Sequence, residues 1–129
     1  MISAARRDAV RRRAGDCCEY CRLPQAAEPD ARFHIEHIVA RQHGGDDEET
    51  NLALACHRCN RHKGPNLSGI DPSGGSPTLL FHPRRETWEE HFRAEQWEII
   101  GLTAAGRATV SLLQMNAAVR MELRRWIST

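Results

Sequence analysis

Two C-x-x-C pairs constrain the fold of this chain more than any other feature of its sequence. They are Cys18-Glu19-Tyr20-Cys21 and Cys56-His57-Arg58-Cys59. Each pair lets two thiolates face one tetrahedral ion at about 2.3 Å per Zn–S bond, so the sequence predicts a structural zinc site made by Cys18, Cys21, Cys56 and Cys59. Residues 22–55 separate the pairs and exceed the roughly 15–20 residues of a plain zinc ribbon. We therefore expect a functional segment between the pairs, held in place by the metal.

The fifth cysteine, Cys17, leaves an alternative ligand set open. It could replace Cys18, although the two-residue spacing to Cys21 favours Cys18. Buried thiols or a redox pair are the other interpretation of the cysteines. The N-terminal segment MISAARRDAVRRR is basic, and no apolar segment follows it, so the sequence does not predict a secretory signal. We expect a cytoplasmic protein, in which cysteines bind metal rather than form disulfides.

Length and charge limit the classes of protein. The 129 residues suit one domain with a modest core. We expect one domain at 1–129, with a basic helix at 1–17, a zinc-stabilised core at 18–64 and a mainly helical extension at 78–129 that packs on the core. A net charge of +1 argues against a protein that coats nucleic acid through bulk charge. Apolar runs extend over only a few residues, so we expect no membrane association.

The first half of the chain predicts a helix, a hairpin and a second helix. Apolar residues at helical spacing indicate a helix over 4–14, and alternation over 33–39 indicates a strand. A second strand over 52–55 would form a hairpin with a long connection, in which Gly44-Gly45 and the acids 46–49 predict a solvated loop. A helix over 57–63 ends at Gly64-Pro65. Residues 66–77 are rich in turn formers and predict a linker or surface loop.

The second half predicts the order helix, strand, helix, helix, which makes the fold α+β. Thr87 and Glu90 have the spacing of a capping box, and residues 96–101 are strand-like. Thr103 can cap a helix that continues to Leu113, and Asn116 can cap a last helix. That helix carries its apolar residues on one side: Val119, Leu123, Trp126 and Ile127. We expect the large aromatic residues to be core, namely Trp88, Phe92, Trp97 and Trp126.

Chemically reactive side chains concentrate between the cysteine pairs and just after them. His34-Ile35-Glu36-His37 lies in the first predicted strand, and Asn51 precedes the second. Asn60-Arg61-His62-Lys63 lies on the helix that follows. Successive side chains of a strand point to opposite faces, so Glu36 and His37 would share a site only if the backbone there is irregular or wraps the helix. Composition alone leaves this open.

The string EHIVARQHGGDDEETNLALACHRCNRHKG at 36–64, with CEYC upstream, resembles the HNH endonuclease family in its zinc-knuckle subgroup, which has the ββα-metal fold. The pattern is an acid–His pair, a Gly-Gly loop, Asn-Leu, and a C-x-x-C followed at once by His or Asn and then by Lys. The resemblance implies metal-dependent hydrolysis of phosphodiester bonds in DNA, without a small-molecule cofactor.

The resemblance also implies a role for each matching residue. His37 would be the general base that takes a proton from the attacking water. Glu36 and Asn60 would bind one Mg²⁺ or Mn²⁺ ion, and Asn51 would brace the loop that orients His37. Glu36 stands where Asp is usual and Asn60 where many members have His, while Ala40 replaces a frequent proline. His34 is a second candidate to replace or support a ligand.

Three cations of the helix after the second cysteine pair are candidates for DNA contacts: Arg58, Arg61 and Lys63. They could bind phosphates, or they could simply stabilise the C-terminal end of the helix through its dipole. Two further hypotheses belong to other classes of protein. One is a zinc-supported module that binds nucleic acid or a protein without cutting, and the other is a purely structural zinc domain.

Overall fold

The computed structural model describes residues 1–128, and the chain divides into two compact units, Met1–Pro65 and Asn66–Thr129. Both units mix helices and strands, which confirms the predicted α+β class. The packing of residues 78–129 on the zinc-stabilised core stays a prediction. Within the described residues, no helix combines the length and the apolar character that crossing a membrane requires.

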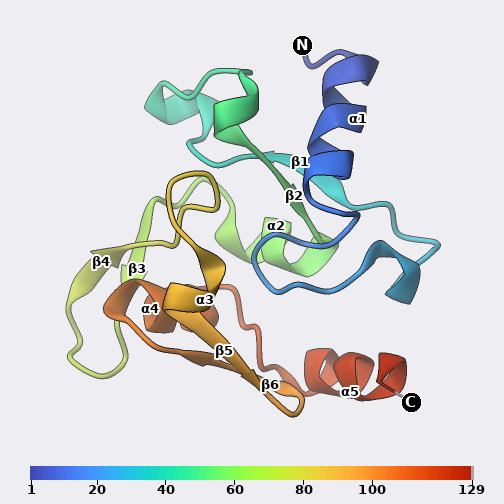
Figure 1. Cartoon of the computed structure of the whole chain (residues 1–129). Helices are drawn as coiled ribbons and strands as arrows, with labels where there is room; N and C mark the ends of the chain where they lie inside the picture. The colour runs from blue at the N-terminus through green and yellow to red at the C-terminus, as the bar shows by residue number, and fades with distance from the viewer. Residues whose placement is uncertain (129) are drawn as a thin grey trace. The chain divides into compact units, whose positions relative to one another are not determined.

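The first unit is built around a hairpin followed directly by a helix (Figure 1). Strand β1 (His34–His37) pairs antiparallel with β2 (Leu52–Ala55), so that His34 lies opposite Ala55 and His37 opposite Leu52. After Cys56 the chain enters α2 (His57–Lys63). The long connection contains two short 3-10 helices, η2 (Arg41–His43) and η3 (Glu49–Asn51). This order of elements is the predicted ββα core.

Helix α1 (Ala4–Arg13) confirms the predicted basic helix and is fixed to the hairpin by its own arginines. The Ser3 side chain caps it by accepting from the Arg6 N–H. The Arg11 guanidinium donates to the Phe33 carbonyl, and that of Arg13 donates to the Leu52 carbonyl. Two arginines of this helix therefore stabilise its packing against the hairpin.

The core of the first unit centres on β2. All four residues of this strand are fully buried, which suits a run without polar alternation. Large side chains from the rest of the unit complete the core, including Val10, Tyr20, Phe33 and Ile38. A short 3-10 helix, η1 (Gln25–Ala27), lies in the segment between the first cysteine pair and β1. Strand β2 of the hairpin is thus fully buried, whereas its partner β1 carries the polar residues His34, Glu36 and His37.

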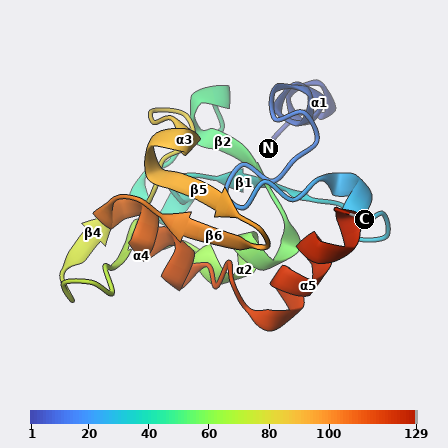
Figure 2. The ribbon, with the colours of Figure 1, turned by 60° about the horizontal axis from the view of Figure 1, so that its bottom comes forward.

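Over residues 66–128, the second unit contains two hairpins and three helices. Strands β3 (Ser68–Ile70) and β4 (Pro77–Leu79) pair, as do β5 (Phe92–Glu95) and β6 (Glu98–Gly101). The helices are α3 (Trp88–His91), α4 (Ala104–Leu112) and α5 (Ala118–Ile127). Figure 2 shows β5 and β6 side by side with α4 next to β6. The predicted order helix, strand, helix, helix therefore omitted three of the four strands.

The prediction of a plain linker at 66–77 was wrong in part, because β3 and the start of β4 lie there. Asp71 holds the turn by accepting from the Ser73 N–H. The Asp71 carboxylate also accepts two hydrogen bonds from the Arg107 guanidinium, each 2.9 Å long. This partner lies far along the chain, so turn formers alone could not reveal the hairpin.

The predicted capping box at Thr87 and Glu90 was also wrong. The Thr87 side chain makes no capping bond, α3 is a single turn, and Phe92 begins β5 instead of continuing the helix. Phe92 packs in the core with ring centroids 5.1 Å from both Phe81 and Trp88. Burial of this aromatic cluster overrides the local helical pattern.

At the ends of the last two helices, one predicted cap is confirmed and one is not. Thr103 caps α4 by accepting from the Gly106 N–H. Asn116 does not cap α5, because its amide pairs instead with both the N–H and the carbonyl of Ile99. The expectation that Trp126 is core was wrong, since its side chain is 73% exposed. Trp88 and Phe92 are buried as expected, and Trp97 is half-buried.

Candidate functional site

The four cysteines of the two C-x-x-C pairs come together in a buried cluster. Their sulfur atoms all lie within 4.8 Å of one another. Four Zn–S bonds of about 2.3 Å in a tetrahedron give S···S edges of about 3.8 Å, and Cys21 Sγ lies 3.7 Å from Cys56 Sγ. Cys17 is outside the cluster. The cluster therefore fits a structural zinc ion held by the cysteines that the spacing favoured.

Local backbone geometry prepares both cysteine pairs for a metal. The Cys21 N–H points at Cys18 Sγ, 3.5 Å away, and the Cys59 N–H points at Cys56 Sγ, 3.4 Å away. Such N–H groups stabilise negative charge on sulfur. Burial raises the pKa of the Cys18 and Cys59 thiols well above the ordinary value. A cation at the centre of the cluster would offset that penalty and keep the sulfurs as thiolates.

Glu36 lies inside the first unit, in contact with a hydroxyl and an ammonium group. The Tyr20 hydroxyl donates to Glu36 Oε2 at 2.7 Å, and Lys63 Nζ lies 2.6 Å from Oε1. Both partners are almost fully buried. Burial raises the pKa of Glu36, and the adjacent Lys63 ammonium opposes this shift. The network links the first cysteine pair, β1 and the last turn of α2.

The expectation that Lys63 contacts DNA does not agree with this arrangement. Lys63 is only 2% exposed, and its ammonium also donates to the Ile38 carbonyl at 2.9 Å. Arg58 is half-buried and donates to both carboxylate oxygens of Glu28 at 2.9 Å. Arg61 is exposed. Of the three predicted DNA contacts, Arg61 is therefore the one whose side chain is exposed, and its contact with DNA stays a prediction.

Replacing Lys63 by methionine tests this placement. Lys63→Met leaves the Glu36 carboxylate buried without its counter-charge, so the free energy of unfolding should fall by about 3–5 kcal/mol. Urea denaturation followed by circular dichroism measures the change. The control Arg61→Met removes an exposed charge from the same helix and should stay within about 0.5 kcal/mol of the wild type. Equal stability of the two variants, with DNA binding lost only in Lys63→Met, would contradict the buried ion pair.

His37 ends β1 and is held by a carboxylate from the long connection. Its Nε2 lies 2.8 Å from Asp47 Oδ1, and the ring is 20% exposed. Arg41 also donates to both oxygens of Asp47, at 2.9 and 3.1 Å. The hydrogen bond with His37 and the Arg41 guanidinium together hold the pKa of Asp47 far below its ordinary value. The imidazole is therefore oriented by a carboxylate that stays ionised.

Asn51 ties the two ends of the long connection together. Its side-chain oxygen accepts from the Val39 N–H at 2.8 Å, and its amide nitrogen donates to the carbonyls of Val39 and Asp46, at 3.0 and 2.9 Å. The Asn51 main-chain carbonyl accepts from the Ile38 N–H at 2.8 Å. These bonds fix the chain immediately after His37, which is the geometry that a bracing residue requires.

The Gly-Gly motif belongs to the same brace. Gly44 has a φ of 88°, which favours glycine. A Cβ on Gly45 would lie 1.7 Å from the Val39 carbonyl oxygen and 2.9 Å from the Asn51 amide nitrogen. The backbone of the loop can approach Val39 only because position 45 has no side chain.

Gly45→Ala should therefore displace the brace. The clash is with main-chain atoms, so the loop must shift, and we expect a loss of about 1–3 kcal/mol in the free energy of unfolding. Urea denaturation measures it against Gly74→Ala, at a position where a Cβ meets nothing within 4 Å. The control should cost no more than about 0.5 kcal/mol. If the two alanine variants are equally stable, Gly45 is not part of a fixed loop.

Asn60, the second expected ligand of a hard metal, lies half-buried on α2. It comes one turn before Lys63, so both residues lie on the same face of the helix. The Glu36 carboxylate contacts the Lys63 ammonium on that face. Among the described residues, no hydrogen bond joins the Asn60 side chain to Glu36 or His37. Glu36 and His37 have separate partners and point apart, as alternation along a strand predicts.

The donor set of this region suits a hard divalent ion chemically, because it offers a carboxylate and an amide oxygen. The carboxylate of Glu36 already has a cation, the ammonium of Lys63, at its side. An Mg²⁺ or Mn²⁺ ion bound by Glu36 and Asn60 would therefore compete with Lys63 for Glu36.

Sequence reasoning missed the residues that hold the expected site in place. Tyr20 was noted only as a spacer of the first cysteine pair, yet it donates to Glu36. Asp47 was assigned to a solvated acidic run, yet it binds His37. Glu28 was not singled out, yet it neutralises Arg58. One signal was available for Asp47, because a carboxylate in an acidic loop that closely follows a histidine can fold back and bind the imidazole. No spacing rule pointed to Tyr20 or Glu28.

Comparison with known proteins gives one result that bears on the class. The family described as HNH endonuclease matches residues 18–66, which include both cysteine pairs, the hairpin and α2. The match confirms the resemblance to the HNH endonuclease family over residues 18–66, a range that contains the cysteine cluster suited to zinc. Searches of curated proteins and of solved structures found no match.

Proposed function

We propose that this protein is an endonuclease that hydrolyses phosphodiester bonds in DNA, with the HNH domain at 18–66 as its catalytic part. One observation carries the proposal. His37, the residue that the family motif assigns as general base, is oriented by the Asp47 carboxylate on a loop that Asn51 braces. A histidine supported in this way has the geometry of a base rather than of a surface residue.

The Asp47 contact also determines which nitrogen of His37 takes the proton. If Nε2–H donates to the ionised Asp47 carboxylate, the lone pair of the neutral ring is on Nδ1. In our proposal, Nδ1 accepts a proton from a water molecule as its oxygen attacks phosphorus, and the positive charge on the ring is stabilised by Asp47. Asn51 keeps the ring in place, so it is a positioning residue.

In the same proposal, Glu36 and Asn60 would hold Mg²⁺ or Mn²⁺, and Arg61 would meet the DNA backbone. The ion would supply charge stabilisation at the scissile phosphate and at the departing 3′ oxygen. The ion would have to displace the Lys63 ammonium from Glu36, so we expect it to bind weakly.

Added Mn²⁺ should therefore restore part of the stability that Lys63→Met loses, because it would replace the missing counter-charge of Glu36.

The rival proposal is a zinc-supported binding module that does not cut. Filter binding and gel cleavage of the same duplex, run side by side, separate the two. The nuclease should bind weakly without a divalent ion and release product with one. A binding module would instead associate tightly without metal, would keep its affinity in the double variant Glu36→Ala with His37→Ala, and would give no product under any divalent ion.

A further inference from the structure

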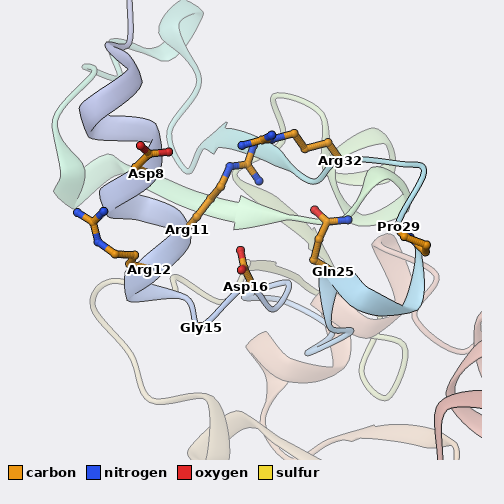
Figure 3. Close-up of a pocket in the computed structure, with 8 residues that line it drawn as sticks. All are labelled: Asp8, Arg11, Arg12, Gly15, Asp16, Gln25, Pro29 and Arg32. Atoms are coloured by element: carbon orange, nitrogen blue, oxygen red, sulfur yellow. The ribbon is translucent and has the colours of Figure 1, made fainter.

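A pocket in the first unit, at the end of β1 opposite to His37, carries an unusual set of arginines. It is open to solvent and has a volume of about 580 Å³ between α1 and the segment that leads into β1. Figure 3 shows the guanidinium groups of Arg11 and Arg32 next to each other, with Gln25 across the pocket. Arg12 lies at its rim, and Asp8 and Asp16 also line it.

Asp8 and Asp16 act on the Arg11 guanidinium only through their charge, and the structure describes no ion pair between either acid and this group. Burial and then the charge of Arg32 are the main causes that lower the pKa of Arg11. Within the described residues, neither Asp8 nor Asp16 forms an ion pair with a pocket arginine at 4 Å or less. Arg11 Nε is buried and has no hydrogen-bond partner. Two guanidinium groups of like charge at close range, both lining one pocket, indicate a site for an anion.

The pocket is held rigid by hydrogen bonds on both of its sides. Gln25 donates to the carbonyls of Glu28 and Ala31, at 3.0 Å each, and accepts from the Phe33 N–H at 2.7 Å. These bonds fix the segment that carries Arg32. On the other side, Arg11 donates to the Phe33 carbonyl at 2.9 Å, which orients its guanidinium. The backbone segment that carries Arg32 and the Arg11 guanidinium are thus held in place before an anion binds.

We propose that Arg11 and Arg32 bind a phosphodiester group of duplex DNA at a distance from the cleaved bond. This inference rests on the proposed nuclease function and adds a second contact with the substrate. Arg32 precedes β1 and His37 ends it, so at about 3.3 Å per residue their backbones are roughly 16 Å apart. The pocket would therefore hold the backbone a few nucleotides from the cut, where it positions the DNA without taking part in the chemistry.

Arg32→Gln, made in the His37→Ala background so that DNA stays intact, tests the proposal. Arg32 is exposed, so the variant should fold. Filter binding to a short duplex should show affinity reduced about tenfold, and the slope of log affinity against log salt should become shallower by about 0.9. The control Arg7→Gln removes an exposed arginine charge from α1, outside the pocket, and should change affinity less than about twofold.

Three results would overturn the proposal. One is equal weakening by Arg32→Gln and Arg7→Gln, which would indicate general basic charge. A second is unchanged DNA affinity in Arg32→Gln while inorganic phosphate still raises the melting temperature of the wild type, which would indicate a site for free phosphate. The third is no DNA binding by the wild type. Failure of the nuclease proposal looks different, because DNA would bind at the pocket and no product would form.

Discussion

Cys59→Ser should leave the first unit unfolded and free of zinc. The four buried cysteines stabilise the fold only when a metal binds their sulfur atoms. Structural zinc contributes about 10–16 kcal/mol in zinc-finger peptides, which is as large as the roughly 5–15 kcal/mol that stabilises a whole domain. Purified wild type should contain one zinc per chain, and the variant should be insoluble or lack the metal, as measured by elemental analysis and by hydrogen exchange over residues 1–65.

Cys17→Ser is the matched control, because Cys17 adjoins Cys18 in sequence but lies outside the cluster. It should keep the zinc and the exchange protection of the wild type. If Cys17→Ser proves as damaging as Cys59→Ser, or if the wild type contains no zinc, then the assignment of the ligands is wrong.

His37→Ala should lower the rate of DNA cleavage by roughly two to four orders of magnitude. The side chain is partly exposed, and its hydrogen-bond partner Asp47 lies on the long connection and not in the core, so the fold and the affinity for DNA should remain. Single-turnover cleavage of a labelled duplex measures the rate, and filter binding measures the affinity. Asp47→Asn should cause a smaller loss with the same unchanged affinity, because the base remains but its orienting charge is gone.

Glu36→Ala and Asn60→Ala separate the base from the expected metal ligands. Both variants should weaken binding of the divalent ion, so excess Mn²⁺ should restore part of their activity and almost none in His37→Ala. Glu36→Ala also leaves the Lys63 ammonium buried without its counter-charge, so its activity is compared only after circular dichroism shows that it is folded. Equal rescue of all three variants would show that the roles are misassigned.

The first unit could be predicted largely from sequence because its determinants are local or strictly spaced. The C-x-x-C spacing predicted the cysteine cluster, and the helix over 57–63 ends at Gly64 as the stop signal indicates. The partners of the site residues could not be predicted in the same way. Glu36 was expected to face a metal, but Tyr20 and Lys63 surround it, and such a buried network depends on tertiary packing that no spacing rule records.

The second unit was predicted less well for two physical reasons. The turn between β5 and β6 places Gln96 at a φ of 54°, where glycine or asparagine would have given a hairpin signal. Without that signal, Phe92 was assigned to a helix. Asn116 has the residue type of a helix cap, but an amide can equally pair with a strand backbone, and here it pairs with Ile99.

Conversion of supercoiled plasmid by purified, zinc-loaded protein tests the central claim most directly. With Mg²⁺ or Mn²⁺ we expect nicked or linear product from the wild type, no product when EDTA removes the divalent ion, and almost none from His37→Ala under either condition. Equal product from the wild type and His37→Ala, or none from a wild type that retains its zinc and binds the plasmid, would contradict the assignment of this HNH domain as a nuclease that uses His37 as its base.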